Sequence, residues 1–566
     1  MSGMSASSVT TVLTGSPVVP GVGYAPALRP GRRPALPPEG AADVPPARRE
    51  EEAARLGAAT TAVAQRLRDR ASQATGAASE VLAATAGLAS DKAWLADADK
   101  RISAGLPATN AITAATEKFI AMFTKLGGLY AERVTDLQDV RDRVLAELAG
   151  TPEPGVPQPD SPAVLLADDL APADTAGLDP KLIVGIATRL GGPTSHTAII
   201  ARQLGIPCIV AVPGLGGVAA GTPVLIDGAA GTITVEPERE AAARRTEEAA
   251  RDAATVAGWH GPGRTADGHP VAVLANVQDG TSAQAAAERP VEGVGLFRTE
   301  LAFLDRADEP SSAEQTEMYR AVLDAFGGRK VVIRTLDAGS DKPLAFVDHP
   351  DEANPALGVR GVRIARDDAG ILTRQLDAIA AAGDAAGEAA GSPWVMAPMI
   401  ATAGEAREFA ALCRERELTP GVMIEVPAAA LLADAVFAEV EFVSIGTNDL
   451  TQYAMAADRM SSQLATLTDP WQPAVLRLVE LVGAAGARAG KPVGVCGEAA
   501  ADPLLACVLV GLGATSLSCA PNAAAAVGAR LAGVTLEQCR AAAAAALETA
   551  DPRSARAAAE AAVASR

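Results

Sequence analysis

One short motif in this chain has residue types and a spacing suited to chemistry at a single histidine. Residues 191–196 read Gly-Gly-Pro-Thr-Ser-His, and a mostly apolar run follows them. The pattern predicts a helix over residues 194–204, which Thr194 or Ser195 can cap through its hydroxyl. His196 would then lie in the first turn, where backbone N–H groups and the helix dipole favour an anion. A neutral imidazole there can accept a phosphoryl group and hold it.

The alternative is that this histidine only caps or packs, which is the ordinary role of a lone histidine. The chain has four histidines, and only His196 stands in a Gly-Gly-x-Thr-Ser-His turn. The other three are His260, His269 and His349. We therefore interpret His196 as a reacting residue.

A second group of polar residues follows apolar runs in the C-terminal half of the chain. Guanidinium groups bind carboxylate and phosphate through paired hydrogen bonds, so several arginines in one site indicate a ligand with two or three negative charges. Glu425 and Asp449 add two carboxylates, which together with a bound phosphate are typical of a magnesium site. Each residue taken alone could be an ordinary ion pair on a loop. The arginines are Arg298, Arg334, Arg360, Arg363 and Arg459.

Cys496 stands in a Val-Cys-Gly-Glu sequence at the end of another apolar run. A lone cysteine after a strand is usually a small buried hydrophobic residue. Among arginines that tune its pKa, it could instead act as an acid. We interpret the other five cysteines as structural.

The elements that must position these residues form a repeated pattern. Eight short apolar runs recur over about 250 residues, most of them followed by a helical segment, as a (β/α)8 barrel requires. Arg298, Arg334, Glu425 and Cys496 lie at or just past the C-terminal ends of these runs, the face on which barrel enzymes carry their sites. The predicted strands cover residues 271–277, 294–297, 330–334, 394–398, 421–426, 441–445, 492–496 and 515–519.

The N-terminal part has a different pattern. After a short β-like opening at 18–27 comes a Pro-rich linker and then a segment rich in Ala, Leu, Glu and Arg, with helical periodicity at 51–74, 117–132 and 137–148. Short β runs with one helix follow. The fold class is thus multidomain α/β: a small β/α domain with an all-helical insert, then a barrel. The expected divisions are 1–30 and 151–235 for the β/α domain, 47–150 for the insert, 236–265 for a linker helix and 266–550 for the barrel.

Composition limits the possible functions. The chain has 566 residues, and its 49 basic and 68 acidic residues give a net charge of −19, which excludes nucleic acid and anionic membranes as expected partners. Hydrophobic residues make up 49%, enough for large cores. The six cysteines form no CxxC pair, which indicates free thiols in a reducing cytoplasm. We expect no signal peptide. The uncharged stretch 503–528 predicts a helix and a strand rather than a membrane span.

Together these residues resemble Enzyme I of the phosphoenolpyruvate-dependent sugar phosphotransferase system, over nearly the whole chain. The resemblance rests on residues 16–27, the Asp-Asp-Leu-Ala-Pro segment at 168–172, the His196 motif, Glu-Val-Pro at 425–427, Gly-Thr-Asn-Asp-Leu-Thr-Gln-Tyr at 446–453 and Cys-Gly-Glu at 496–498. The motif at His196 alone would indicate only an enzyme that uses phosphoenolpyruvate. Its combination with this domain order is specific.

The resemblance implies a Mg²⁺-dependent transferase that moves the phosphoryl group of phosphoenolpyruvate to His196 and then to a histidine of the phosphocarrier protein HPr, releasing pyruvate. It also implies a homodimer formed through the barrel, with HPr bound at the helical insert. Cys496 resembles the acid that protonates the enolate carbon. The remaining roles are substrate binding for Arg298, Arg334, Arg360, Asn448, Asp449 and Arg459, and metal binding for Glu425 and Asp449.

Some residues depart from the family pattern, and rival functions must be weighed. Arg189, Pro193 and Gln472 stand where the family commonly has other residues, and the first two adjoin His196. Pyruvate phosphate dikinase and phosphoenolpyruvate synthase are similar in two domains, but they need a large ATP-grasp domain, and only 195 residues precede His196. A signalling paralogue would be expected to carry a further N-terminal sensory domain. A non-catalytic scaffold would not be expected to keep the full set of charged reacting residues.

Overall fold

The computed structural model describes residues 11–564, apart from short gaps. The chain divides into two compact units, Met1–Arg251 and Asp252–Arg566, which are described one at a time. The residues outside the description are 1–10, 32, 39, 41, 74–76, 127–128, 158, 171, 176–177, 193–194, 305, 340–343, 348–351, 367–368, 388–392, 460, 462–463, 465 and 565–566.

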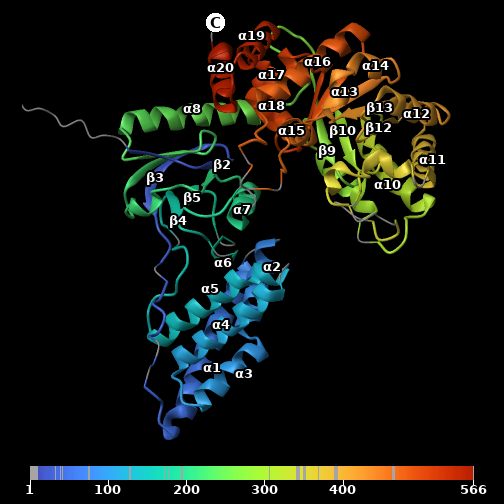
Figure 1. Ribbon diagram of the computed structural model, residues 1–566. Coiled ribbons are helices and arrows are strands. Elements are labelled where there is room, and N and C mark those ends of the chain that lie inside the picture. The colour runs from blue at the N-terminus through green and yellow to red at the C-terminus, as the bar shows by residue number, and fades with distance from the viewer. Residues whose placement is uncertain are drawn as a thin grey trace, which may run out of the picture. The chain divides into compact units, whose positions relative to one another are not determined.

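The first unit contains a bundle of five helices, drawn in blue and cyan in Figure 1. Their apolar faces pack around Leu56, Leu67, Trp94, Ile112 and Val144, all of which are fully buried. Helical spacing of these positions gives each helix one apolar face, as bundle packing requires. The helices are α1 (Arg49–Gln73), α2 (Ala77–Ala89), α3 (Lys92–Ser103), α4 (Ala108–Leu126) and α5 (Leu129–Ala149).

The same unit contains a mixed eight-stranded sheet. The strand order is β1-β8-β7-β3-β4-β5-β6-β2, in which β3 through β6 run parallel and the remaining pairings are antiparallel. The strands are β1 (Thr11–Thr14), β2 (Ser16–Val19), β3 (Val22–Leu28), β4 (Ala163–Ala167), β5 (Ile183–Thr188), β6 (Cys208–Val210), β7 (Pro223–Asp227) and β8 (Thr232–Val235). Short helices α6 (Pro172–Thr175) and α7 (His196–Leu204) follow β4 and β5, and α8 (Arg239–Ala257) follows β8.

The second unit is a closed barrel of eight parallel strands (Figure 1). The strands pair in chain order from β10 to β16, and β9 closes the barrel between β16 and β10. All eight apolar runs predicted from the sequence form these strands. They are β9 (Ala272–Val277), β10 (Gly293–Arg298), β11 (Lys330–Arg334), β12 (Trp394–Ala397), β13 (Thr419–Ile424), β14 (Phe442–Gly446), β15 (Val493–Cys496) and β16 (Ser516–Cys519).

Helices surround this barrel, and alternate strand residues face them. On β14, Val443 and Ile445 belong to the large core between strands and helices, whereas Phe442 packs inside the barrel with Met423 and Cys496. The helices are α9 (Gly280–Ala287), α10 (Ser312–Phe326), α11 (Ala369–Ala386), α12 (Ala403–Arg414), α13 (Pro427–Leu431), α14 (Ala433–Phe437), α15 (Thr447–Met455), α16 (Pro473–Ala489), α17 (Pro503–Gly511), α18 (Ala524–Ala532), α19 (Leu536–Leu547) and α20 (Pro552–Ala564).

The fold class predicted from the sequence is confirmed. The predicted helical segment 117–132 covers the end of α4 and the start of α5, and residues 127–128 between them lie outside the description. Strand β1 was not predicted. Residues 503–528 form α17, β16 and the start of α18, as expected. Among the described residues, no helix is long and apolar enough to cross a membrane.

Candidate functional site

A cavity of about 680 Å³ opens at the C-terminal end of the barrel strands. Residues at or just past the ends of β10, β11, β13, β14 and β15 line it. This placement follows from the parallel strands, whose carboxyl ends meet on one face. The cavity brings together seven of the residues identified in the sequence: Arg298, Arg334, Glu425, Asn448, Asp449, Arg459 and Cys496.

Arg334 is held by two carboxylates. Its Nη2 donates to Glu300 Oε1 across 2.6 Å, and its Nη1 lies 3.1 Å from Asp337 Oδ2. Burial works against the positive charge, but Glu300 and Asp337 outweigh it and raise the pKa of Arg334 above its ordinary value. The Nε atom is buried without a hydrogen-bond partner. A charged guanidinium with an unused donor at a cavity wall is suited to an anionic ligand.

Arg360 lies behind the cavity wall. Its side chain is almost completely buried and is not among the groups that line the cavity. Nε lies 3.0 Å from Asp337 Oδ1, and Nη2 lies 3.0 Å from Asp337 Oδ2. Nη1 lies 3.3 Å from Asp449 Oδ1. Arg363 is further removed, since its Nη1 donates to Gly358 O at 3.2 Å. Of these two, Arg360 connects the site's acidic residues, and Arg363 supports a loop.

Glu425 has one carboxylate oxygen occupied and one free. Oε1 accepts from the backbone N–H of Met399 across 2.6 Å, whereas Oε2 is buried and has no hydrogen-bond partner. Burial, followed by the charges of Asp337 and Asp449, raises the pKa of Glu425 to about 8. A buried acceptor left unpaired is unusual, and a cation beside it would satisfy it.

The donor set therefore fits a hard divalent cation such as Mg²⁺. Among the described residues, no cluster of three or more His, Cys, Asp or Glu side chains is grouped to hold a metal by itself. Mg²⁺ commonly takes one or two carboxylates from the protein and fills its other positions with substrate phosphate and water. Glu425 and Asp449 match that requirement, and the adjacent arginines match the phosphate.

The loop after β15 interlocks with the start of α15. Asn448 Oδ1 accepts from the backbone N–H of Glu498 across 3.2 Å. Gly497 has a φ of +102°, and a Cβ there would lie 2.6 Å from Thr447 Oγ1 and 2.9 Å from Asn448 Oδ1. Only glycine combines this backbone with so close an approach. The position of Asn448 therefore depends on Gly497.

Cys496 ends β15 with its thiol buried at the floor of the cavity. Its Sγ lies 3.5 Å from the Ser444 hydroxyl oxygen and 3.5 Å from the carbonyl oxygen of Ile445. Burial raises the pKa of the thiol above its ordinary value, although the Ser444 hydroxyl and Arg334 oppose that shift. The thiol is therefore protonated at neutral pH, as a proton donor must be.

The histidine motif lies in the first unit, between β5 and α7. Ser195 caps α7, with its hydroxyl accepting from the backbone N–H of Ala198 across 3.4 Å. His196 is the first residue of the helix; its side chain, and residues Pro193 and Thr194, lie outside the description. Arg189, one of the departures from the family pattern, pairs with Asp168 across 2.7 Å at the surface.

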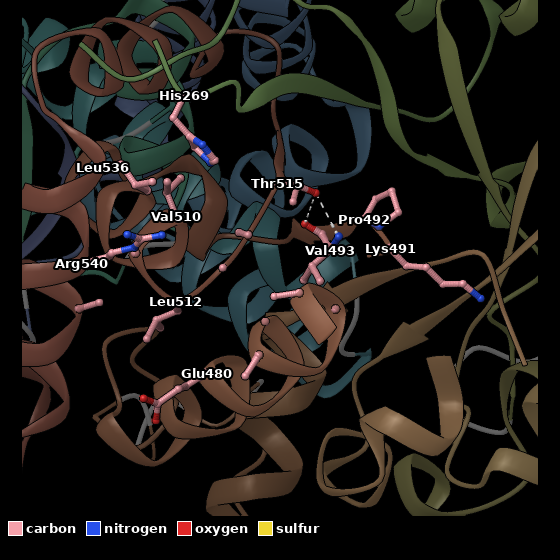
Figure 2. Close-up of a pocket in the computed structure, with 18 of the residues that line it drawn as sticks. His269, Glu480, Lys491, Pro492, Val493, Val510, Leu512, Thr515, Leu536 and Arg540 are labelled. Carbon is pink, nitrogen blue, oxygen red and sulfur yellow. Dashed lines mark hydrogen bonds between the residues drawn. The ribbon is translucent and has the colours of Figure 1, made fainter. Parts of the chain in front are cut away.

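A second cavity, of about 700 Å³, lies at the opposite end of the barrel strands. It is bounded by the starts of β15 and β16 and by α16, α17 and α19. Figure 2 shows Arg540 and His269 on one wall and Glu480 apart from them, with the Lys491 side chain directed away. It holds none of the predicted site residues and no converging arginines, so it is not the candidate site.

Sequence reasoning missed three polar residues of the barrel site. Asp337 and Glu300 hold Arg334, and Ser444 contacts Cys496. Asp337 follows Arg334 by three residues and Glu300 follows Arg298 by two, so proximity to a predicted site residue was an available signal. For Ser444 the signal was a serine within an apolar strand, since a polar group inside a barrel needs a partner.

Comparison with known proteins covers both units. Residues 256–536 match the family model "PEP-utilising enzyme, PEP-binding domain", residues 159–231 match its "mobile domain" and residues 14–133 match its "N-terminal" model. A phosphoenolpyruvate-protein phosphotransferase of Streptomyces coelicolor is 50% identical over 527 residues, which cover 92% of this chain and 94% of that protein. One from Haloferax volcanii is 42% identical over 431 residues, which cover 74% of this chain and 75% of that protein.

Proposed function

The chain belongs to the phosphoenolpyruvate-protein phosphotransferase family, and from its site we propose that it transfers the phosphoryl group of phosphoenolpyruvate to His196 and then to a histidine of HPr. Pyruvate is the second product. The observation that carries the proposal is the barrel cavity, which Arg298, Arg334 and Arg459 line together with carboxylates that include Glu425 and Asp449. That arrangement suits a small, highly anionic substrate bound together with a cation.

The first step requires the substrate phosphate to be held for attack by His196. Arg298 and Arg334 bind the phosphate, and Asn448 and Arg459 bind the phosphate and carboxylate. Arg360 acts through Asp337 and Asp449, which it holds in place. Glu425 and Asp449 hold Mg²⁺, which when bound neutralises negative charge on the phosphate and on the forming enolate. Catalysis is then mainly positioning and electrostatic stabilisation.

In the second step, the enolate of pyruvate is protonated. Cys496 donates its proton to the methylene carbon, which converts the enolate to pyruvate. In the preceding step, His196 attacks the phosphorus in line, so that an N–P bond forms as the P–O bond to enolpyruvate breaks, and the histidine keeps the phosphoryl group until HPr accepts it. One histidine must visit both phosphoenolpyruvate and HPr, so the segment that carries it has to move between them. The helical bundle, α1 to α5, is the proposed docking region for HPr.

A steady-state assay tests this proposal. Purified protein is mixed with phosphoenolpyruvate, Mg²⁺ and HPr, and pyruvate is followed through lactate dehydrogenase. We expect continuous turnover that needs all three additions. A single burst of pyruvate, stoichiometric with enzyme, is expected when HPr is omitted. Turnover that is independent of HPr would overturn the assignment of the acceptor.

The assembly and location are also proposals. We expect a homodimer formed through the barrel, which light scattering at high protein concentration with Mg²⁺ and phosphoenolpyruvate would detect. A monodisperse monomer under those conditions would contradict it. All six cysteines are free and buried, and we expect the protein to act in the reducing cytoplasm.

A further inference from the structure

Ser444 is a hydroxyl residue inside the barrel, where serines of β16 and apolar side chains lie around it. On β14 it shares a face with Phe442, which packs with Met423, Met396 and Leu296. The Ser444 side chain is buried, with 5% of the residue exposed. A hydroxyl taken from water into such surroundings costs free energy unless it finds a partner. The partner that the structure gives it is the thiol of Cys496.

Strand register brings the two residues together. Cys496 is paired with Gly446 on β14, and Ser444 is paired with Gly494 on β15. The two side chains are therefore diagonal neighbours on one face of adjacent strands. The hydroxyl oxygen lies 3.5 Å from Sγ, within the range for hydrogen bonds to sulfur.

The two contacts of Cys496 Sγ have opposite effects on its proton. The carbonyl oxygen of Ile445 accepts from the S–H group and so favours the protonated thiol. The Ser444 hydroxyl donates to sulfur and so favours the thiolate. The hydroxyl is therefore the one of the two contacts that would stabilise negative charge on sulfur.

We propose that Ser444 is a positioning residue for enolate protonation: it orients the Cys496 thiol and stabilises the thiolate left when the proton departs. This rests on the proposed function of Cys496. In the step, the S–H bond of Cys496 breaks and a C–H bond forms at the methylene carbon of enolpyruvate. The electron pair of the S–H bond stays on sulfur. After pyruvate leaves, the thiolate takes a proton from water in the open cavity.

The test isolates proton transfer at carbon. Protein, Mg²⁺, phosphoenolpyruvate and pyruvate are brought to equilibrium in D₂O, and loss of the pyruvate methyl proton signal is followed by NMR. We expect Ser444→Ala to slow the maximal exchange rate about tenfold with an unchanged half-saturating pyruvate concentration, since a hydrogen bond to a charged group is lost. Ser444→Thr keeps the hydroxyl and should restore most of the rate.

A matched control removes another barrel hydroxyl. Ser518 donates to Ala275 O at 3.1 Å and to Asn276 Oδ1 at 2.6 Å, and neither group is Cys496. Ser518→Ala should leave methyl exchange near the wild-type rate. Equal rates for wild type and Ser444→Ala, or equal losses in the two alanine variants, would overturn the proposal.

Phosphorylation and pyruvate release by the wild-type protein, measured beside methyl exchange, separate this inference from the proposed function. If the proposed function is wrong, the wild-type protein itself forms no phosphoprotein and releases no pyruvate from phosphoenolpyruvate. If only the role of Ser444 is wrong, the wild-type protein exchanges methyl protons and Ser444→Ala matches it. Thermal unfolding of each variant shows whether the barrel is intact. If Ser444 acted only through packing, Ser444→Thr would not be expected to restore the exchange rate.

Discussion

Arg360 holds Asp337 through two parallel contacts, Nε to Oδ1 and Nη2 to Oδ2, each of 3.0 Å. The same carboxylate lies 3.1 Å from Nη1 of Arg334, which lines the cavity. The orientation of a proposed phosphate-binding arginine therefore depends on a residue that does not line the cavity.

Arg360→Met should impair both stability and substrate use. Removing one partner from a buried ion network leaves the remaining charges uncompensated, which typically costs about 3 kcal/mol or more. We also expect kcat/KM for phosphoenolpyruvate to fall at least about tenfold, because Arg334 and Asp449 lose their support. Urea unfolding and the pyruvate assay measure the two effects. The control is Arg374→Met, which removes an exposed pair with Glu309 and should cost under about 1 kcal/mol of stability. Equal losses of stability and of kcat/KM in Arg360→Met and Arg374→Met would contradict the account.

Glu425→Gln should separate metal binding from stability. The carboxylate is buried with Oε2 unpaired, and burial raises its pKa to about 8. The neutral amide avoids the free-energy cost of burying an ionised carboxylate, so the metal-free variant should unfold at or above the wild-type temperature. Because an amide is a weaker magnesium ligand, Mg²⁺-dependent pyruvate release should fall at least about 100-fold. Calorimetric titration with Mn²⁺ in the presence of phosphoenolpyruvate checks the binding directly; undiminished binding would refute the ligand assignment.

Much of this architecture could be predicted from sequence because it depends on local patterns. Continuous apolar runs such as 330–334 predicted the barrel strands, and parallel strands place their C-terminal residues on one face. The ion network could not be predicted in the same way. Arg360 is separated from Asp449 by 89 residues, and no periodicity indicates which carboxylate a guanidinium contacts. The contact between Ser444 and Cys496 depends similarly on strand register, which the sequence does not specify.

Gly497→Ala tests the interlock between the β15 loop and α15. A Cβ at this position would lie 2.6 Å from Thr447 Oγ1, and the positive φ is itself unfavourable for alanine. We expect a loss of roughly 1–3 kcal/mol in stability and a raised KM for phosphoenolpyruvate, because Asn448 shifts. The comparison is Gly404→Ala, where a Cβ would meet only Thr402 Oγ1, at 3.8 Å. Retention of the wild-type KM in Gly497→Ala would contradict the proposed role of Asn448.

Asp136 on α5 predicts a pH effect on the helical bundle. Its Oδ1 is buried without a hydrogen-bond partner, and burial raises its pKa to about 6. The folded state therefore binds this proton more tightly than the unfolded state does, so Asp136 makes stability fall as pH rises from about 4 to about 6.

Asp136→Asn should remove the loss of stability that ionisation of Asp136 causes. Because the residue is partly exposed, we expect a gain of only about 1 kcal/mol at pH 7 and little change at pH 4. Thermal unfolding at both pH values measures it. Glu117→Gln replaces an exposed acid on α4 and serves as the control with no gain at either pH. A destabilised Asp136→Asn at pH 7 would show that its charge is compensated in the fold.

The central claim is that His196 carries the phosphoryl group, and labelling tests it most directly. Wild-type protein and His196→Ala are incubated with Mg²⁺ and phosphoenolpyruvate labelled with ³²P, and the protein is then exposed to acid or base. We predict label on the wild type that is lost in acid and kept in base, as a phosphohistidine requires, and no label on His196→Ala. Equal labelling of the two proteins, or a folded wild type that takes up no label with Mg²⁺ present, would contradict the account.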